Sequence, residues 1–439
     1  MDTSKFYGKE KISRILLKIA PPVMLAQLIQ ALYNIVDSLF VGKYSETGLT
    51  ALSIIYPLQL LMIALAVGTG VGINTDMAYY FGIRQEKKAE EVAGIGTPLA
   101  VFLWIVFAAV CYLIMPFYAR ISTNSEEIIR DVVVYGRIVC VVSIGLFTEG
   151  VWSKILQARG DMKTPMVAQI AGAITNIILD PILIFGMFGI HKFGIAGAAI
   201  ATVIGQVAAG CLALLYLRRL KTVHIRREDL RPTRKLTCRI LALGFPSLLT
   251  QMLSALVQIT LNNLMRAYGA ATVYGSDIAL SVYGMMMKVY QIAHSMFVGV
   301  SSAIQPINGY NFGANHYARV QKTFHIASLI AVGISVVWFL IFMVFPRQIA
   351  SCFVSDNALY LDCAQHCFRL YMLAFFLYGL HMTSASFFQG IGRPGKSLLI
   401  PLARQGCFLI PLALLLSRSF GLDGALLAAP IADALAFLL

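Results

Sequence analysis

Long apolar segments follow one another along almost the whole chain. A helix of about 20 apolar residues can cross the roughly 30 Å hydrocarbon core of a bilayer, because it satisfies its own backbone hydrogen bonds. The composition, 58% hydrophobic and only 13% charged over 439 residues, leaves too few charges to cover a water-soluble fold of this size. The sequence therefore predicts an all-α polytopic membrane protein with twelve transmembrane helices, at 19–41, 50–80, 93–118, 130–157, 165–188, 194–217, 238–266, 277–303, 322–345, 366–389, 397–416 and 421–439.

The basic side chains set the expected orientation. The formal net charge is +14, and Lys and Arg concentrate in alternate connecting segments, with the longest basic run at 218–235 between the sixth and seventh helices. Membrane proteins carry this excess on their cytoplasmic side. We therefore expect a multi-pass protein of the cell membrane with both termini in the cytoplasm, and we interpret the charge as topological and not as a nucleic-acid-binding surface.

The two halves of the chain repeat each other. PPVMLAQLIQALYNIVD at 21–37 matches FPSLLTQMLSALVQITL at 245–261, and FGIAGAAIAT at 193–202 matches FGLDGALLAA at 420–429. Six helices per copy give both copies the same orientation, so a pseudo-two-fold axis runs along the membrane normal, and two lobes with a cleft between them are typical of transporters. We expect three parts: an N-terminal lobe at 1–217, a cytoplasmic linker at 218–237 and a C-terminal lobe at 238–439.

Only the N-terminal copy carries acids within its first and fifth helices. Asp37 and Asp180 align with Leu261 and Ile410 of the second copy. An ionisable residue inside a bilayer is costly and usually functional. The alternative is that both acids only form hydrogen bonds between neighbouring helices.

Further oxygen atoms are expected near these two acids. Asn176 lies one helical turn before Asp180, and Thr202 of the sixth helix has a similar predicted depth. Pro181 has no N–H to donate, so it frees a backbone carbonyl and marks the fifth helix as a candidate site of bending. Such a cluster could hold Na⁺ between Asp37 and Asp180, or share a proton between the two acids.

A substrate cavity can be sketched by residue type. Flexible thioethers, aromatic rings and a few polar groups are typical of promiscuous sites, although each such residue could equally serve packing. Glu149 is interpreted either as a substrate-attracting acid or as a paired structural charge, and Asp76 and Asp433 are expected to face water or to cap helices. The cavity candidates are Gln30, Tyr33, Tyr135, Glu149 and Gln206 in the N-terminal lobe, and Gln251, Met286 and Met287 in the C-terminal lobe.

Several motifs occur together in a fixed order. NIVDSLFVG at 34–42, LQARGDMKTPM at 156–166, NIILDPILIFG at 176–186 and GIAGAAIAT at 194–202 resemble the multidrug and toxic compound extrusion (MATE) family over essentially the whole chain. The resemblance implies two six-helix lobes in a V and export of mostly cationic, amphipathic organic compounds in exchange for Na⁺ or H⁺.

The resemblance also implies where the coupling ion binds. Matching positions assign the site of the subgroup that uses the N-terminal lobe to Asp37, Asn176, Asp180 and Thr202. Another branch of the family uses acids in the seventh and tenth helices, and this sequence has none at 238–266 or 366–389.

Other functions remain as alternatives. A flippase for lipid-linked sugars, from a related superfamily, would share the two lobes but should have a larger, strongly cationic cavity. A passive channel would conduct without gradient-coupled exchange. An enzyme is not expected, because the chain has no HExxH or GxSxG motif. We expect a monomer without cofactors that contacts small organic substrates and membrane lipids.

Overall fold

The computed structural model describes residues 3–123, 125–219, 232–354 and 357–438. This part of the chain is helical and contains no strand. Most of the predicted cytoplasmic linker, residues 220–231, lies outside the described residues, so the structure describes only the two ends of the 218–237 segment.

The described helices form two groups that follow the repeat. The N-lobe, residues 3–219, contains α1 (Thr3–Lys9), α2 (Ile12–Tyr44), α3 (Glu46–Gly82), α4 (Glu86–Ser122), α5 (Glu126–Val141), α6 (Ile144–Ala158), α7 (Lys163–Phe185), the 3₁₀ turn η1 (Met187–Gly189) and α8 (Ile195–Arg219). The C-lobe, residues 234–438, contains α9 (Arg234–Gly269), α10 (Gly275–Gly313), α11 (Tyr317–Val344), α12 (Pro346–Ser351), α13 (Ala358–Tyr371), η2 (Phe375–Leu377), α14 (Tyr378–Gly390), α15 (Pro394–Pro401), the π-helix η3 (Leu402–Leu409) and α16 (Ile410–Phe437).

In the described part of the chain, fewer helices meet the length and composition of a membrane span than the twelve spans predicted, because α10 is not among them and α15 to α16 count once. By length and composition, nine helices in the described part could cross a membrane, or ten if α13 and α14, which meet at 47°, form one bent span. The last two predicted spans share α16, which Gly421 divides at φ 59° and ψ −131°, a conformation that only glycine adopts readily. The all-helical, two-lobed membrane fold predicted from the sequence is therefore confirmed.

Several helices are longer than their apolar segments. The eighth span, predicted at 277–303, continues as α10 to Gly313. Its extension carries Asn308 and Asn311, both completely buried. A hydropathy pattern ends at such residues, whereas the helix continues because neighbouring helices surround it.

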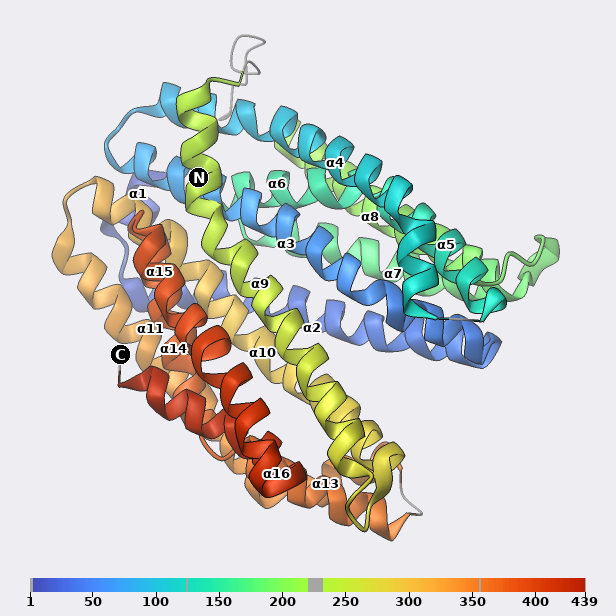
Figure 1. Ribbon diagram of the computed structural model, residues 1–439. Coiled ribbons are helices and arrows are strands. Elements are labelled where there is room, and N and C mark those ends of the chain that lie inside the picture. Colours follow the sequence, from blue (N-terminus) through green and yellow to red (C-terminus); the bar gives the residue numbers. More distant parts are fainter. Residues whose placement is uncertain (1–2, 124, 220–231, 355–356, 439) are drawn as a thin grey trace.

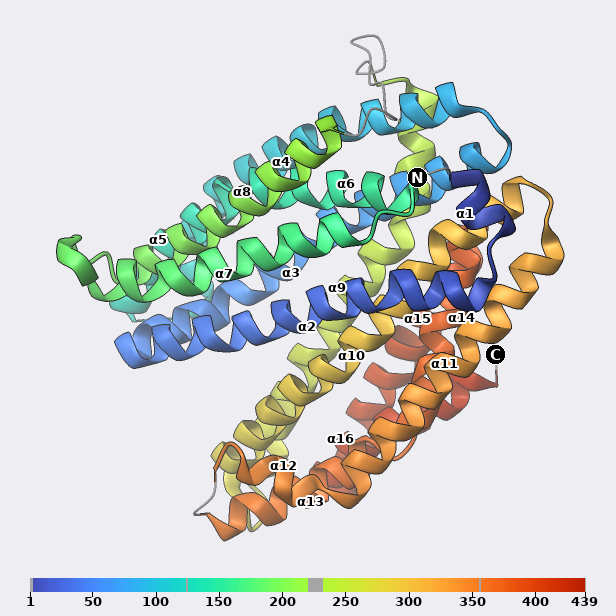
Figure 2. The ribbon, with the colours of Figure 1, turned by 180° about the vertical axis from the view of Figure 1, so that it is seen from behind.

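The two lobes meet at one end and diverge at the other. In Figures 1 and 2, the ends of α2 at Tyr44 and of α9 at Gly269 lie far apart, while the opposite ends of α3 and α9 lie together. A glycine seam brings α3 and α9 close, since a Cβ atom on Gly68 would lie 3.1 Å from the carbonyl oxygen of Gly244. We call these the open end and the closed end.

The short helix α1 links both lobes at the closed end. Tyr7, fully buried, donates its hydroxyl to the carbonyl oxygen of Gln157 in the N-lobe at 3.0 Å. Its own carbonyl oxygen accepts hydrogen bonds from Asn311 Nδ2 and Arg319 Nη2 in the C-lobe, at 3.1 and 2.9 Å. The closed end is thus held by hydrogen bonds as well as by close packing.

Candidate functional site: an acidic cluster and pocket in the N-lobe

Two glycines set the distance between the helices that form the site. A Cβ atom on Gly172 of α7 would lie 2.7 Å from the carbonyl oxygen of Gly205 in α8, and the reciprocal distance is also 2.7 Å. Real side chains do not tolerate such contacts, so the α7–α8 crossing requires glycine on both helices. One turn further along, this close approach places Asn176 of α7 beside Thr202 of α8.

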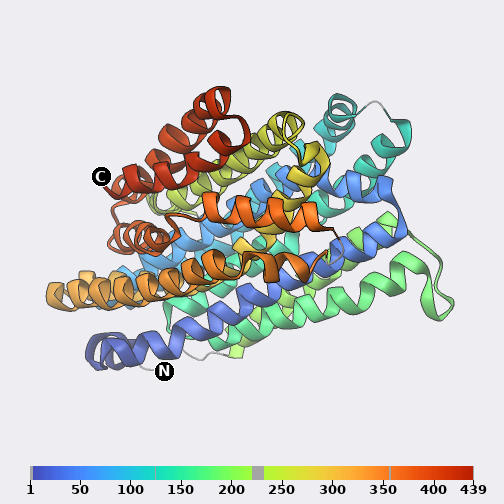
Figure 3. The ribbon, with the colours of Figure 1, turned by 90° about the horizontal axis from the view of Figure 1, so that it is seen from below.

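The structure brings the four predicted cation-site residues together. Asn176 Nδ2 donates to Asp180 Oδ1 at 3.3 Å and lies 3.4 Å from Thr202 Oγ1. Helix α2 runs beside α7 (Figures 2 and 3), and the Asp37 carboxyl group lies within hydrogen-bonding reach of Asp180. All four side chains are at most 8% exposed.

The cluster contains more oxygen atoms than donors. Four buried side-chain oxygens have no hydrogen-bond partner among the described residues: Asp37 Oδ1, Asn176 Oδ1, Asp180 Oδ2 and Gln206 Oε1. An unsatisfied buried polar atom costs about 1–3 kcal/mol, and a charged one costs more. A bound proton or metal cation would relieve several of these penalties at once.

Two tyrosines flank the acids. Tyr33 of α2 and Tyr135 of α5 are close enough to both carboxyl groups to interact with them electrostatically. Gln59 of α3 donates from Nε2 to the Tyr135 hydroxyl at 3.3 Å. Gln59 was not predicted from the sequence, and the only signal for it is a single glutamine within the apolar stretch YPLQLLM.

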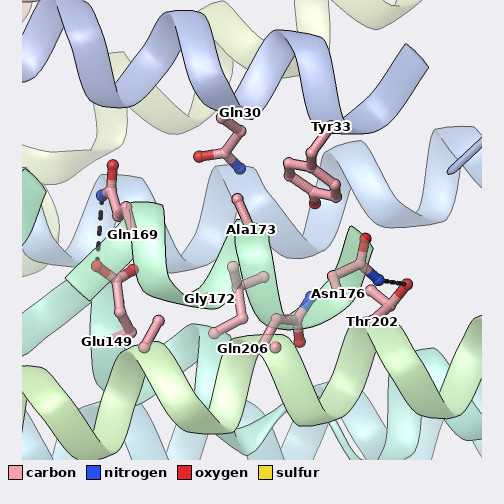
Figure 4. A pocket seen from close by; sticks show the side chains of 12 residues that line it. Gln30, Tyr33, Glu149, Gln169, Gly172, Ala173, Asn176, Thr202 and Gln206 are labelled. Atoms are coloured by element: carbon pink, nitrogen blue, oxygen red, sulfur yellow. Dashed lines mark hydrogen bonds between the residues drawn. The ribbon is translucent and has the colours of Figure 1, made fainter. Parts of the chain in front are cut away.

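A pocket extends from this cluster into the N-lobe (Figure 4). Its empty volume, open solvent included, is about 480 Å³. Its wall contains four predicted cavity residues, and it also contains the polar residue Gln169, which was not predicted from the sequence. The lining residues are Gln30, Tyr33, Leu146, Glu149, Gln169, Gly172, Ala173, Asn176, Thr202, Gly205, Gln206 and Ala209.

The other cavity candidates lie elsewhere. Tyr135 lies beside the acids without lining the pocket. In the C-lobe, Gln251 is half-buried on α9, Met286 is completely buried in the core, and Met287 packs against that core. The structure therefore does not join the C-lobe candidates to the N-lobe pocket.

Pro181 lies within the last two turns of α7. The helix continues through it without interruption from Lys163 to Phe185. The predicted role in bending concerns a change between two states, so it stays a prediction. Gly172, by contrast, has a clear role in packing against α8.

Glu149 of α6 lies at the pocket end nearer the closed end of the protein. Its Oε1 accepts hydrogen bonds from Ser153 Oγ at 2.5 Å and from Gln169 Nε2 at 3.3 Å. Its second oxygen faces the pocket in Figure 4. Glu149 forms no ion pair within 4 Å in the described part of the chain.

Two acids expected at the protein surface are instead buried and paired. Asp76 of α3 forms an ion pair with Arg239 of α9, and Asp433 of α16 forms one with Arg404 of η3. Both acids are less than 5% exposed. The expectation of water-facing or capping acids was wrong, because each acid is paired with an arginine of another helical element: Arg239 of the other lobe for Asp76, and Arg404 of the preceding η3 for Asp433.

The types of ligand atom in the N-lobe cluster limit which ions it can bind. Among the described residues, no group of three or more His, Cys, Asp or Glu side chains could hold a metal ion. The N-lobe cluster instead combines carboxylate, amide and hydroxyl oxygens. Such a set suits a hard cation or a proton and not a transition metal.

Comparisons with known proteins agree with this architecture. The MatE family model matches residues 22–182 and 246–415, one block in each lobe. The chain is 26% identical over 341 residues to a probable multidrug resistance protein, YoeA, of Bacillus subtilis, covering 76% of this chain and 72% of the relative. It is 24% identical to the multidrug export protein MepA of Staphylococcus haemolyticus, covering 98% and 93%.

A solved structure shares the fold. It is a multidrug resistance MATE family transporter in an outward-facing conformation, with a TM-score of 0.90 and 24% identity over 99% of this chain and 95% of that one. Because the family model matches most of both lobes, the chain belongs to the MatE family and is a multi-pass membrane transporter, not an enzyme.

Proposed function

We propose that the protein is a secondary active antiporter of the cell membrane. It exports organic compounds, mostly cationic and amphipathic drugs or toxic metabolites, in exchange for H⁺ or Na⁺. Asp37, Asn176, Asp180 and Thr202 bind the coupling cation, and the adjoining N-lobe pocket receives the substrate. The observation that carries this proposal is that three of these neighbouring residues, Asp37, Asn176 and Asp180, each have a buried oxygen without a donor, which a cation would satisfy.

The proposed orientation follows from charge. The N-terminus lies at the closed end, and α9 begins there with Arg234 and Lys235 after the basic run. Positive charge is retained on the cytoplasmic side. We therefore assign the closed end and both termini to the cytoplasm. Asp37 and Asp180, seven and five residues before the ends of α2 and α7, then face the outside half.

Coupling arises because cation and substrate share one pocket. Tyr33, Asn176 and Thr202 belong both to its lining and to the surroundings of the acids. A cation bound at Asp180 neutralises the carboxylate charge that would attract a cationic substrate, so each ligand weakens the binding of the other. Antiport requires this competition, together with a change in which end of the protein is open. Bending of α7 near Pro181 is the proposed movable element.

The pocket chemistry favours cationic cargo over the flippase alternative. A site for lipid-linked sugar phosphates needs basic side chains, whereas the lining contains no Lys or Arg and presents Glu149. We accordingly propose small organic substrates that enter a monomeric protein from the cytoplasm or the membrane, without any cofactor.

Exchange in proteoliposomes tests this function. Export of a fluorescent organic cation should follow an imposed Na⁺ gradient or an imposed pH gradient, and Asp180→Asn should reduce gradient-driven export to background. Asp131→Asn is the matched control, because Asp131 is an N-lobe acid that accepts a hydrogen bond from Thr47 and does not line the pocket. Normal gradient-driven export by Asp180→Asn would overturn the proposed cation site.

A further inference from the structure

A second arrangement of acid and aromatic groups lies at the closed end, away from the pocket. Asp76 of α3 and Arg239 of α9 form an ion pair across the two lobes, with Oδ1 and Nε 2.7 Å apart. Arg239 Nη1 lies 3.4 Å from the Tyr80 hydroxyl, and its guanidinium carbon lies 5.2 Å from the ring centroids of both Tyr79 and Tyr80. The Arg239 guanidinium is thus surrounded by a carboxylate and two aromatic rings, and Lys88 Nζ of α4 also lies 5.8 Å from the Tyr80 ring centroid.

Burial of this pair is uneven. The Asp76 side chain is completely buried, whereas the Arg239 side chain is 43% exposed. Neither carboxylate oxygen of Asp76 has a well-aligned hydrogen bond from a described residue. The nearby guanidinium is therefore the main compensation for this buried charge.

The chain connectivity divides the arrangement between the lobes. Asp76, Tyr79 and Tyr80 all belong to α3 of the N-lobe, whereas Arg239 belongs to α9 of the C-lobe. If the closed end opens, the three α3 residues, which we call the cage, remain together and Arg239 departs. A carboxylate with aromatic faces at cation–π distance is the arrangement that binds organic ammonium and guanidinium groups.

We propose that the cage is the cytoplasmic entry site for organic cations, and that Arg239 is a tethered occupant which fills it in the closed state. This inference rests on the proposed function, because it requires a transporter that opens alternately to each side. Opening without a substrate separates the Asp76 carboxylate from the guanidinium that pairs with it and leaves this ion pair unreplaced. An arriving organic cation replaces the guanidinium, so loading and opening of the cytoplasmic end favour each other.

Substitutions of Asp76 and of Arg239 should then change the KM for uptake in opposite directions. Asp76→Asn removes the carboxylate that attracts the substrate, and it should raise the KM for uptake of tetraphenylphosphonium into inside-out vesicles about tenfold or more. Arg239→Gln removes the tethered competitor and leaves the carboxylate, and it should lower that KM several-fold. A simple latch between the lobes predicts the same direction of change for both variants, because both break the same ion pair.

The chain offers a matched control. Asp433→Asn also removes the acid of a buried Arg–Asp pair, but Arg404 and Asp433 lie within one lobe, so the KM should stay within about twofold of the unmodified protein. Tyr79→Leu and Tyr80→Leu keep the carboxylate and should each raise the KM several-fold, which tests the cage even if Asp76→Asn folds poorly.

The outcomes separate this inference from the proposed function. A parallel KM shift in Asp76→Asn and Arg239→Gln, or unchanged KM in both tyrosine variants, overturns the cage while gradient-driven uptake by the unmodified protein upholds antiport. If the unmodified protein neither takes up tetraphenylphosphonium under an imposed gradient nor binds it in detergent, the function and the cage both fail.

Discussion

The two lobes share a scaffold and treat buried acids in opposite ways. In the N-lobe, Asp37 and Asp180 lie together and each has a carboxylate oxygen without a donor. In the C-lobe, Asp433 is bound by Arg404, whose guanidinium carbon also lies 5.1 Å from the ring centroid of Tyr378. A buried acid that an arginine of its own lobe neutralises needs no ligand, unlike Asp76, whose arginine belongs to the other lobe. A buried acid without one is available to a cation.

The repeat makes this comparison more exact. The alignment of 193–202 with 420–429, continued along the helices, pairs Gln206 with Asp433. Equivalent positions therefore face the interior of each lobe, and the C-lobe adds a guanidinium from the π-helix η3. Local π-helical geometry is frequent at functional sites, and here it presents a charged side chain to the lobe interior.

A basic side chain introduced beside the N-lobe acids should have the largest effect on export. In Asn176→Lys, an ammonium group would lie beside Asp180, much as Arg404 lies beside Asp433. We expect gradient-driven export in proteoliposomes to fall at least about 100-fold, while the protein stays folded because an opposite charge is supplied to buried acids. Asn176→Gln keeps the amide and serves as the control. Export by Asn176→Lys at half the normal rate or more would contradict this view of the site.

Breaking the C-lobe pair should mainly affect stability. Arg404→Gln leaves Asp433 buried without its partner, and removing one member of a buried ion pair costs about 3–5 kcal/mol. Asp180→Asn, which removes an acid that has no such partner, should cost less than about 1 kcal/mol or be stabilising. Thermal unfolding in one detergent measures both variants. Equal destabilisation would show that the two lobes do not differ in this way.

The fold and the acidic cluster were predictable because they depend on patterns along the chain. Span lengths follow from hydropathy, and the one-turn spacing of Asn176 and Asp180 places both on one face of α7. Asp37 and Thr202 required an additional argument from depth. Repeat alignment then showed which of these polar residues the second lobe lacks.

The ion pairs and the pocket wall could not be predicted in the same way. Arg239 is 163 positions from Asp76, and no periodicity in the sequence links them. Gln169 and Gln59 are single glutamines within apolar helices, and their neighbours depend on helix rotation and crossing angle. The glycine contact between Gly172 and Gly205 determines that crossing, and it is visible only in three dimensions.

Stabilisation of the folded protein by a bound cation should be an effect of intermediate size, and it should depend on the N-lobe acids but not on the C-lobe pair. A cation that binds only the folded protein stabilises it by about 2.7 kcal/mol at 100 times its Kd. We expect Na⁺, or protons in the case of H⁺ coupling, to raise the unfolding temperature of the unmodified protein and of Asp433→Asn. Asp37→Asn should lose most of this rise. If neither Na⁺ in place of choline nor acidification stabilises the unmodified protein, no cation binds the N-lobe cluster.

The smallest effect is expected at the prolines that both lobes share. Pro181 follows the acid of the N-lobe site, whereas Pro411 follows Ile410 and no acid. Replacing either with alanine restores a backbone N–H and stiffens the helix locally. Only in the N-lobe is bending proposed to accompany cation binding, so Pro181→Ala should slow exchange about two- to fivefold. Pro411→Ala should change it less than about 1.5-fold. Equal slowing by both would make the proline a shared packing feature, and the movable element of the N-lobe would then lie elsewhere in α7 or at its contact with α2.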